Sequence, residues 1–565
     1  MNRKSLPTLA VLAASALVSA CATTPTTTAS APAPAAAAEP DIDLALMKDM
    51  VRTLSSDEFE GRGPSTAAEP KTLDYIVAKF KEAGLQPGNK GSWLQDVPMV
   101  GITASAQTPL KVTGGASPMS FSFGDQYVAA SYRVTPKTQI TDSPLVFVGY
   151  GINAPELGWN DYAGLDMKGK TAVILVNDPD YETATEDGLF KGRRMTYYGR
   201  WTYKFEEAAR QGATAALIIH DTFPAAYGWN VVNSSWTGEQ YYVQTANDGA
   251  DQTAANGWMQ KDVAEKILAA AGKDLATLTA AAKQKGFKPV PLNLKASFGF
   301  DNALKKSMSH NVVGLLPGKT RPNEYVLYSG HWDHLGRCTP DATGDDICNG
   351  AVDNATGIAA LAAIAKAEKA AGGAERSQVF LAVTLEESGL LGSEYYAQNP
   401  VFPLDQTVGG VNMDALAPSG RTRDYAITGG DKSDLTALVR QTIAAKGLVE
   451  TPEASSEKGH YYRSDHFSFA KKGVPMFDVS RGRDLVEGGT AAGDAVAEDY
   501  TVNRYHQPSD EYSDDWNWDG IVQDVEMYYT LGRLLADSDQ WPNWNEGDEF
   551  RAIRDKACAA SPNGC

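Results

Sequence analysis

The chain has 565 residues, of which 43% are hydrophobic and 21% are charged, a balance that is ordinary for a globular protein. Single hydrophobic cores stop growing well below this length, so two or three domains are expected. The formal net charge of −19 disfavours nucleic acid as a partner, because non-specific binding to phosphates requires a basic surface.

The first 20 residues have the pattern of a secretory signal peptide. Arg3 and Lys4 precede an apolar run from Leu6 to Ala20, which is too short to span a bilayer comfortably. Cys21 follows in a Val-Ser-Ala-Cys stretch that resembles the bacterial lipobox, in which the cysteine is diacylated after cleavage. The pattern predicts an exported lipoprotein facing the periplasm or the cell surface. A plain signal peptide with an incidental cysteine is the alternative.

Residues 21–40 are rich in Ala, Thr and Pro and predict a low-complexity tether. The other four cysteines fall into two short-range pairs, Cys338 with Cys348 and Cys558 with Cys565. In an oxidising compartment these pairs predict two disulfides. Neither pair has the two-residue spacing of a zinc knuckle, so zinc binding by these cysteines is not expected.

Packed sequence starts near residue 41, and residues 41–124 are expected to be the N-terminal part of the main domain. Apolar residues at helical spacing predict helices over 46–54 and 73–80, and Gly84 stands where the second helix should end.

Residues 125–300 have a different texture, with short β-rich runs and turns. Strands are predicted at 145–148, 171–175 and 215–219, with a helix near 205–211. The stretch from Asp161 to Lys170, followed by a strand, resembles the protease-associated (PA) domain, a module inserted in several exopeptidases. We call residues 125–300 the insert.

Residues 301–545 alternate between strands and helices, and residues 546–565 form a C-terminal tail. Strands are predicted at 325–328, 379–384 and 408–413, and an Ala-rich helix at 355–370. This alternation predicts an α/β fold with a doubly wound, mostly parallel sheet. In such sheets functional groups collect beyond the carboxyl ends of the strands.

Acidic and imidazole side chains fall at the ends of these predicted strands and before the helix. The set comprises His331, Asp333, Asp353, Glu386, Glu387, Asp414 and, further along the chain, His506. Imidazole and carboxylate donors suit zinc. Carboxylates that crowd together also resist joint ionisation. Two divalent cations would relieve that repulsion and could form a hydrolytic metal pair.

Five motifs occur in a fixed order: His-x-Asp, Gly-Ala-x-Asp-Asn, Glu-Glu-x-Gly-x-x-Gly-Ser, Asn-x-Asp and Tyr-His. This order closely resembles the co-catalytic zinc aminopeptidases of metallopeptidase clan MH. The relevant branch is the bacterial secreted aminopeptidases, with transferrin-receptor-like carboxypeptidases as relatives. The resemblance covers most of the chain, from Glu60-Gly61-Arg62 through the PA-like insert to the zinc domain.

The resemblance implies an enzyme that hydrolyses N-terminal residues from peptides and holds two zinc ions per chain. His331 and Asp414 would bind one ion, and Glu387 and His506 the other. Asp353 would bridge the two ions.

Three further residues would act around these ligands. Asp333 would hold the imidazole of His331, as ligand histidines generally require. Glu386 would be the general base that takes a proton from a metal-bridging water and passes it to the leaving amine. Tyr505 matches a tyrosine that stabilises the oxyanion in some members.

Plainer interpretations remain for single residues. Glu386 and Glu387 could be a solvated acidic pair, and Asp353 could cap the following helix. His334 is expected to have a structural or supporting role. His460 and His466 lie in a polar aromatic loop that could line the substrate pocket or cover the sheet.

Other functions are also open. A carboxypeptidase or dipeptidase with the same metals would need a basic pocket, which Arg463, Arg481 and Arg483 could supply. A glutaminyl-cyclase-like transferase would work with one zinc, and a non-catalytic binding protein would have lost ligands. The complete set of five ligands disfavours both. The sequence carries no signal for an oligomeric state.

Overall fold

The structure, a computed structural model, describes residues 40–561. The predicted signal peptide, Cys21 with nearly all of the tether, and Cys565 lie outside the described residues. No helix in this described part of the chain combines the length and the apolar character that crossing a bilayer requires.

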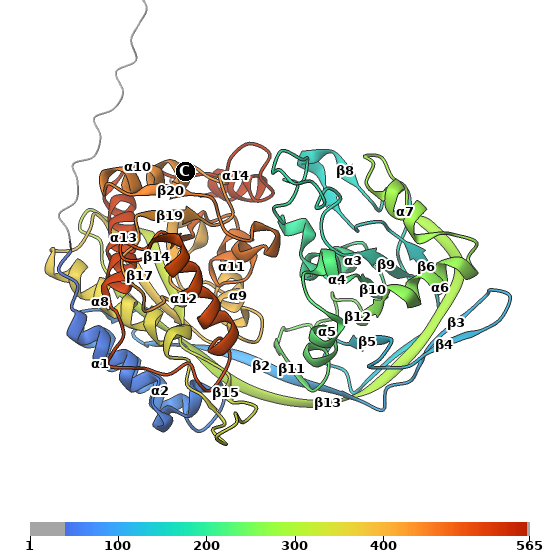
Figure 1. Cartoon of the computed structure of the whole chain (residues 1–565), viewed down its shortest axis with the longest axis horizontal. Helices are drawn as coiled ribbons and strands as arrows, with labels where there is room; N and C mark the ends of the chain where they lie inside the picture. The colour runs from blue at the N-terminus through green and yellow to red at the C-terminus, as the bar shows by residue number, and fades with distance from the viewer. Residues whose placement is uncertain (1–39, 562–565) are drawn as a thin grey trace, which may run out of the picture. The chain divides into compact units, whose positions relative to one another are not determined.

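One end of the main sheet belongs to the C-terminal part of the chain (Figure 1). Its first four strands are parallel, and the fifth pairs with its neighbour in the antiparallel sense. A mostly parallel α/β sheet was predicted for this part, and the structure confirms it. The order is β21 (Met476–Phe477), β18 (Thr407–Asn412), β14 (Arg321–His331), β17 (Arg376–Val383) and β13 (Val290–Leu316).

Both faces of this sheet are buried, because successive side chains of a strand point to opposite sides. On β14, Val326 and Tyr328 belong to one core cluster, whereas Tyr325 and Leu327 belong to another. One face is covered by α1 (Leu44–Leu54), α2 (Glu69–Glu82), α8 (Thr356–Ala370), α10 (Leu435–Ala445) and α13 (Asp519–Asp537). The other is covered by α9 (Leu391–Gln398) and α11 (His466–Ala470).

Helix α8 is the Ala-rich helix that the sequence predicts, and it is apolar on nearly every side. Most of its residues are buried, with Lys366 and Lys369 among the few exposed ones. A helix that is hydrophobic all round belongs in a protein interior. Because α8 is the helix that connects the parallel strands β14 and β17, the turn Ala351–Ala355 at its start lies at the carboxyl edge of these strands.

The insert contains the strands and the helix predicted for it. The sheet continues from β13 through β6 (Lys137–Phe147), β9 (Thr171–Leu175), β10 (Ala215–His220), β12 (Ala255–Gln260) and β5 (Tyr127–Ala130). Two further clusters of buried hydrophobic residues surround these strands. The PA assignment and the domain boundaries stay predictions.

Strand β13 has 27 residues and belongs to both parts, a continuity that the sequence did not predict. Its N-terminal half pairs with β6 and its C-terminal end with β17. Along its middle it pairs with β2 (Leu94–Ser105), which in turn pairs with β11 (Glu239–Val243). Hydrogen bonding therefore runs without interruption from the insert into the C-terminal sheet (Figure 1).

The remaining elements are shorter or lie at the periphery. The helices are α3 (Trp201–Arg210), α4 (Thr222–Ala225), α5 (Trp229–Ser235), α6 (Lys261–Ala270), α7 (Leu275–Ala282), α12 (Gly489–Asn503) and α14 (Arg551–Ala560). The strands are β1 (Gln86–Pro87), β3 (Leu110–Thr113), β4 (Met119–Phe121), β7 (Asn153–Ala154), β8 (Trp159–Asn160), β15 (Gly336–Arg337), β16 (Ile347–Cys348), β19 (Asp424–Ile427), β20 (Val449–Thr451) and β22 (Val479–Arg481). Gly84 follows α2 with a φ of 88°, as its predicted place at the helix end requires.

Candidate metal centre

The predicted ligands gather at the carboxyl edge of the parallel strands. His331 is the last residue of β14, Glu387 follows β17, and Asp414 follows β18. Asp353 lies in the turn before α8, and His506 lies shortly after α12. Parallel strands end at a common edge, so residues more than 170 positions apart meet in one place.

Asp353 lies between two imidazoles. Its Oδ1 is 3.2 Å from Nε2 of His331, and its Oδ2 is 3.5 Å from Nε2 of His506. The carboxylate is almost fully buried, with 4% of the residue exposed. One carboxylate therefore offers one oxygen to each of two histidines.

Each histidine also faces a carboxylate of its own. Nε2 of His331 is 3.2 Å from Oδ1 of Asp414, and Nε2 of His506 is 3.1 Å from Oε2 of Glu387. The five side chains thus divide into two groups that share Asp353. This is the same division that the family resemblance implies.

Asp333 supports His331 chiefly through its main chain. Nδ1 of His331 lies 3.0 Å from the main-chain oxygen of Asp333 and 3.9 Å from its carboxylate. A carbonyl oxygen only accepts, so the neutral ring carries its proton on Nδ1 and leaves Nε2 free to bind a cation. The carboxylate of Asp333 instead accepts a hydrogen bond from the main-chain N–H of Glu386 at 3.2 Å.

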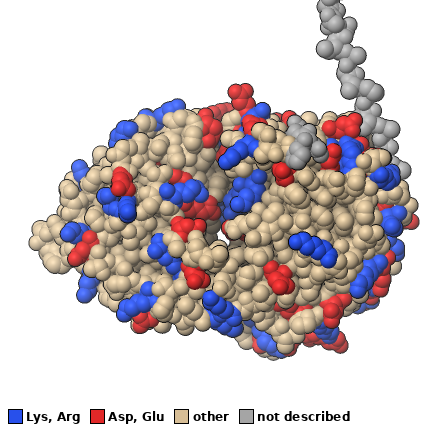
Figure 2. Space-filling model, turned by 180° about the vertical axis from the view of Figure 1, so that it is seen from behind, with Lys and Arg blue, Asp and Glu red and all other residues tan. Residues whose placement is uncertain are grey.

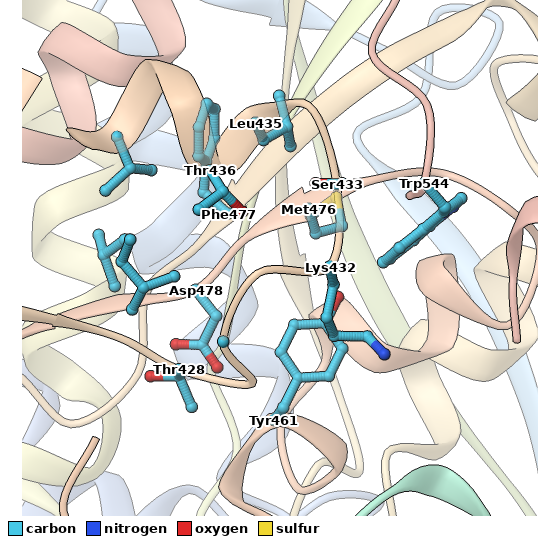
Figure 3. Close-up of a pocket in the computed structure, with 14 residues that line it drawn as sticks. Thr428, Lys432, Ser433, Leu435, Thr436, Tyr461, Met476, Phe477, Asp478 and Trp544 are labelled. Atoms are coloured by element: carbon cyan, nitrogen blue, oxygen red, sulfur yellow. The ribbon is translucent and has the colours of Figure 1, made fainter. Parts of the chain in front are cut away.

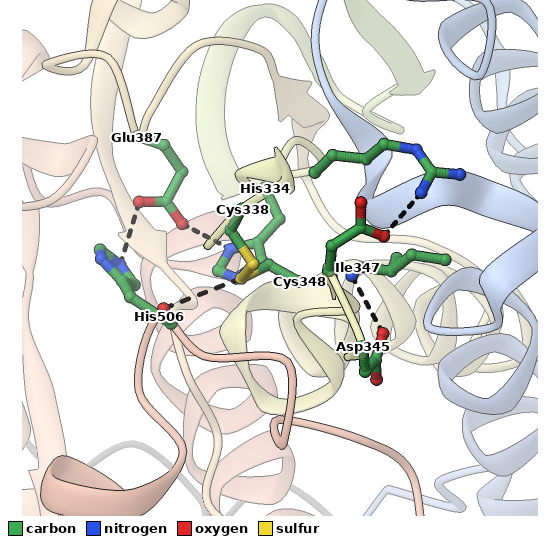
Figure 4. Close-up of a disulfide and its surroundings, with 9 residues drawn as sticks. His334, Cys338, Asp345, Ile347, Cys348, Glu387 and His506 are labelled. Carbon is green, nitrogen blue, oxygen red and sulfur yellow. Dashed lines mark hydrogen bonds and ion pairs between the residues drawn. A yellow bond between two sulfur atoms is a disulfide. The ribbon is translucent and has the colours of Figure 1, made fainter. Parts of the chain in front are cut away.

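His334 contacts the centre more closely than the sequence suggested. It is buried, and its Nδ1 lies 2.6 Å from Oε1 of Glu387 (Figure 4). Glu387 therefore uses one oxygen toward His334 and the other toward His506. The sequence placed His334 beside His331, but only the fold reveals that its partner is Glu387.

Ser464 is a second neighbour that the sequence analysis missed. Its hydroxyl donates to Oδ2 of Asp414 at 2.6 Å and accepts from the side-chain amide of Asn412 at 2.7 Å. Asp414 consequently keeps Oδ1 toward His331. No motif in the sequence singled out Ser464, because it comes from a loop after the predicted strands.

The turn that carries Asp353 is fixed from two sides. The carboxylate of Asp510 accepts from the main-chain N–H groups of Val352 and Asp353, at 3.0 and 3.1 Å. On the other side the buried guanidinium of Arg62 donates to the main-chain oxygens of Trp332, Asn349 and Gly350. Arg62 belongs to the Glu60-Gly61-Arg62 stretch, and Asp510 follows His506 closely in the chain, but their roles depend on contacts between distant parts of the chain.

The predicted disulfide between Cys338 and Cys348 is present. Sγ of Cys348 lies 3.8 Å from the main-chain oxygen of His506, so the bridged loop contacts the segment that carries a predicted ligand (Figure 4). The second predicted disulfide involves Cys565, which lies outside the described residues.

Tyr505 lies on the open side of the centre. Its ring is stacked on that of His506 with 3.9 Å between centroids, and 44% of the residue is exposed. A side chain in this place can reach a ligand bound over His506, as the predicted oxyanion role requires.

The charges of the centre call for cations. Burial would lower the pKa of His331, yet Asp414 and Glu386 raise it well above its ordinary value. For His506 burial also lowers the pKa, but Asp353 and Glu387 raise it to about 10. Carboxylates thus outweigh the cationic charge that two imidazoles can supply.

The donor set fits zinc. Nitrogen and oxygen atoms lie within 4.8 Å of one another in three overlapping groups of potential ligands. Two contain His331, with Asp353 and Asp414 or with Glu386 and Glu387, and the third joins His334, Asp353 and Glu387. Imidazole and carboxylate groups at this spacing are what zinc binds in hydrolytic sites.

A separate cavity lies beside β21 and α10, lined by residues that include Lys432, Tyr461 and Asp478 (Figure 3). None of the predicted metal ligands lines it. Lys432 forms ion pairs with Asp548 and Glu549, at 2.7 and 3.0 Å. Its charge is therefore neutralised by the C-terminal segment that carries these two residues. This cavity is therefore not the candidate site.

Comparisons with known proteins agree with this description. Residues 311–530 match Peptidase family M28. Aminopeptidase NAALADL1 of Mus musculus is 29% identical over 146 residues, which is 24% of this chain and 18% of that protein. The rat protein of the same name matches equally. The aligned segment thus spans about a fifth of the length of these curated relatives.

Two solved structures are also similar. An aminopeptidase from Aneurinibacillus sp. strain AM-1 has a TM-score of 0.47 at 20% identity, covering 88% of this chain and 95% of that one. BSAP, a zinc aminopeptidase from Bacillus subtilis, has a TM-score of 0.40 at 17% identity, covering 91% and 100%.

The fold and the site define an α/β protein with a carboxylate–imidazole metal centre at the carboxyl edge of its sheet. Residues 311–530, which contain all five predicted ligands, form a metallopeptidase domain of family M28 in clan MH.

His334 generates a testable prediction, because it fixes one oxygen of Glu387. His334→Ala should weaken zinc binding by roughly 10- to 100-fold, as removal of a group that orients a ligand generally does. A chelator competition titration measures this. His220→Ala, which removes a buried imidazole from the insert, should leave zinc affinity unchanged. Equal affinity of wild type and His334→Ala would contradict the assignment.

Proposed function

We propose that the chain is an exported zinc-dependent aminopeptidase that removes N-terminal residues from peptides with two zinc ions. One observation carries the proposal. Asp353 lies between a His331–Asp414 pair and a His506–Glu387 pair, inside a domain of a peptidase family.

His331, Asp414 and Asp353 would hold one ion, and Glu387, His506 and Asp353 the other. When bound, the two ions would lower the pKa of a water molecule and polarise the scissile carbonyl. The residues around them keep the ligands in place: the main-chain oxygen of Asp333 fixes the His331 ring, and His334 and Ser464 each occupy one oxygen of a ligand carboxylate.

Glu386 is the proposed general base. It follows β17, and its main-chain N–H is bound by Asp333, while its carboxylate has no hydrogen bond to any described residue. Burial raises its pKa well above the ordinary value, against the charge of His331 and together with that of Glu387. A raised pKa makes the ionised carboxylate a stronger base, so once bound cations keep Glu386 ionised it could take a proton from the attacking water and deliver it to the leaving amine.

Tyr505 is the proposed oxyanion donor. Its ring lies on His506 at the open side of the centre, and burial raises the pKa of its phenol, with Asp353 and Glu387 adding to the effect. The phenol therefore keeps its proton at neutral pH and can donate a hydrogen bond to a developing negative charge.

Export rests on the N-terminal sequence, with its apolar run and Cys21. The Cys338–Cys348 disulfide supports this proposal, because disulfides persist in oxidising compartments. A lipid on Cys21 would hold the enzyme at a membrane surface, with peptides outside the cytoplasm as substrates.

The proposed roles of Glu386 and Asp353 can be separated by substitution. Glu386→Ala should keep both zinc ions and lose roughly 10²- to 10⁴-fold in kcat, because it removes only the proton transfer. Asp353→Ala should lose zinc itself. Hydrolysis of leucine anilide and metal analysis by mass spectrometry measure the two effects.

A matched control is Glu394→Ala, which removes a partly buried glutamate from α9 and should change neither quantity. Near-normal turnover in Glu386→Ala would mean that another group carries the proton. Full zinc content with normal turnover in Asp353→Ala would rule out the shared carboxylate.

The lipid anchor gives a further prediction. Cells that express the full chain should hold it in the membrane fraction and incorporate labelled palmitate into it. Cys21→Ser should abolish the label and release the protein from the membrane fraction, since stable anchoring requires the acyl chains. A label that persists in Cys21→Ser would contradict lipidation at Cys21.

A further inference from the structure

The insert touches the metallopeptidase domain next to the metal centre. The main-chain N–H of Met195 donates to the oxygen of Ser456 at 3.2 Å, and the rings of Tyr197 and Tyr462 stack with 6.2 Å between centroids. Ser464, which binds the carboxylate of Asp414, lies two residues beyond Tyr462 in the chain. The contact between the two parts therefore lies beside a predicted zinc ligand.

Four arginines come together at this contact, and two of them are neutralised. Arg193 pairs with Glu457 at 2.8 Å. Arg194 pairs with Glu186 at 2.9 Å and also with Glu453.

The other two, Arg200 and Arg463, have no side-chain hydrogen bond or ion pair with any residue between 40 and 561. They come from different parts of the chain, since Arg200 precedes α3 of the insert and Arg463 directly precedes Ser464. Two guanidinium groups at one contact therefore lack an anion.

The missing partner is costly for Arg200. The residue is partly buried, and its Nε is fully buried with no hydrogen-bond partner among the described residues. Burial lowers the pKa of Arg200 to about 10, and the like charge of Arg463 acts in the same direction. Buried charges in proteins are nearly always paired, because removing an ion from water without a partner is strongly unfavourable. A ligand that brings a negative charge would remove this cost.

Two uncharged groups, Tyr227 and His460, lie near the two arginines. Burial raises the pKa of Tyr227, while the charges of Arg200 and Arg463 act to lower it, so the phenol lies near both guanidinium groups. Burial and the charges of Arg463 and Lys458 lower the pKa of His460 to about 4, which leaves its ring neutral at pH 7. A hydroxyl and a neutral imidazole beside two guanidinium groups form a site for a planar anion such as a carboxylate.

Arg481, which was also considered for such a pocket, differs in this respect. Arg481 is paired with Asp524 at 2.8 Å and donates to the main-chain oxygens of Ala417 and Gly420, so it is a structural residue. Lys and Arg side chains also lie on both walls of the hollow on the face shown in Figure 2, together with some acidic ones.

We propose that Arg200 and Arg463 bind a carboxylate of the peptide substrate, and thereby select short peptides with a free C-terminus or peptides with an acidic side chain near the scissile bond. Arg463 directly precedes Ser464, whose hydroxyl binds Asp414, and neighbouring Cα atoms are about 3.8 Å apart. We therefore place the recognised carboxylate on the first or second residue after the cleaved bond. This inference rests on the proposed peptidase function and names its substrate class.

Matched substrate pairs test the inference. Wild type should hydrolyse Leu-Gly with a kcat/KM roughly ten-fold or more above that of Leu-Gly-amide, since a charge-assisted hydrogen bond has about this effect on binding. A comparison of kcat/KM for Leu-Glu-amide and Leu-Gln-amide tests in the same way whether a side-chain carboxylate is recognised. Whichever pair shows the preference identifies the source of the carboxylate.

Arg200→Ala and Arg463→Ala should each bring the preferred ratio close to one, mainly through KM, and leave the amide substrates unchanged. Arg193→Ala, which removes a paired arginine from the same contact, should preserve the ratio. Arg463 is exposed, so its variant remains informative if Arg200→Ala fails to fold.

Binding is also measured without turnover. Calorimetry with zinc-loaded Glu386→Ala should give tighter binding of Leu-Gly than of Leu-Gly-amide, and Arg463→Ala in that background should remove the difference. Equal hydrolysis and equal binding of acid and amide pairs would overturn the inference and leave the peptidase proposal intact. Failure to hydrolyse any of these peptides would overturn the proposed function, and calorimetry would still decide whether the arginines bind a carboxylate.

Discussion

The carboxylate of Asp353, held between the imidazoles of His331 and His506, is the constraint on which the rest of the site depends. Asp510 binds the main-chain N–H groups on one side of its turn, and Arg62 binds main-chain oxygens on the other. Because both contacts involve the main chain, the turn that carries Asp353 is held in place without using its carboxylate. The two halves of the centre are then placed by β14, β17 and β18, whose ends meet at one edge.

Charge explains why such a site holds cations. Glu386, Glu387 and Asp414 lie around Asp353, and Asp465 is fully buried close to them, with neither carboxylate oxygen hydrogen-bonded. Without cations the protein can keep this density of carboxylates only by binding protons, as the raised pKa values of His331 and Glu386 indicate. Divalent ions replace those protons and leave the carboxylates ionised, which is the state that hydrolysis requires.

Much of the fold was predictable from local pattern. The helix over 356–370 and the strands of the C-terminal sheet carry continuous apolar runs, so periodicity places them within a few residues. The candidate ligands were predictable for the same reason, since His331, Glu387 and Asp414 follow such strands. The contact between Glu387 and His334 could not be predicted from the sequence. The two residues are 53 positions apart, and only the parallel pairing of β14 with β17 brings their side chains together.

Contacts between distant parts of the chain account for the other differences. The sequence divided the insert from the C-terminal sheet, but β13 crosses that division as one strand. Arg200 showed no feature in the sequence, because its lack of a partner is visible only once the insert lies against the loop that carries Arg463. Asp333 was expected to hold the imidazole of His331, and its main-chain oxygen makes a closer contact with that ring than its carboxylate does. Local sequence does not distinguish these two atoms.

The central claim is that two zinc ions share Asp353, and anomalous diffraction at the zinc edge tests it most directly. Crystals of the zinc-loaded protein should show two peaks about 3.5–4 Å apart, one beside His331 and Asp414 and the other beside Glu387 and His506. A single peak at full zinc occupancy, or peaks that do not contact Asp353, would contradict the account.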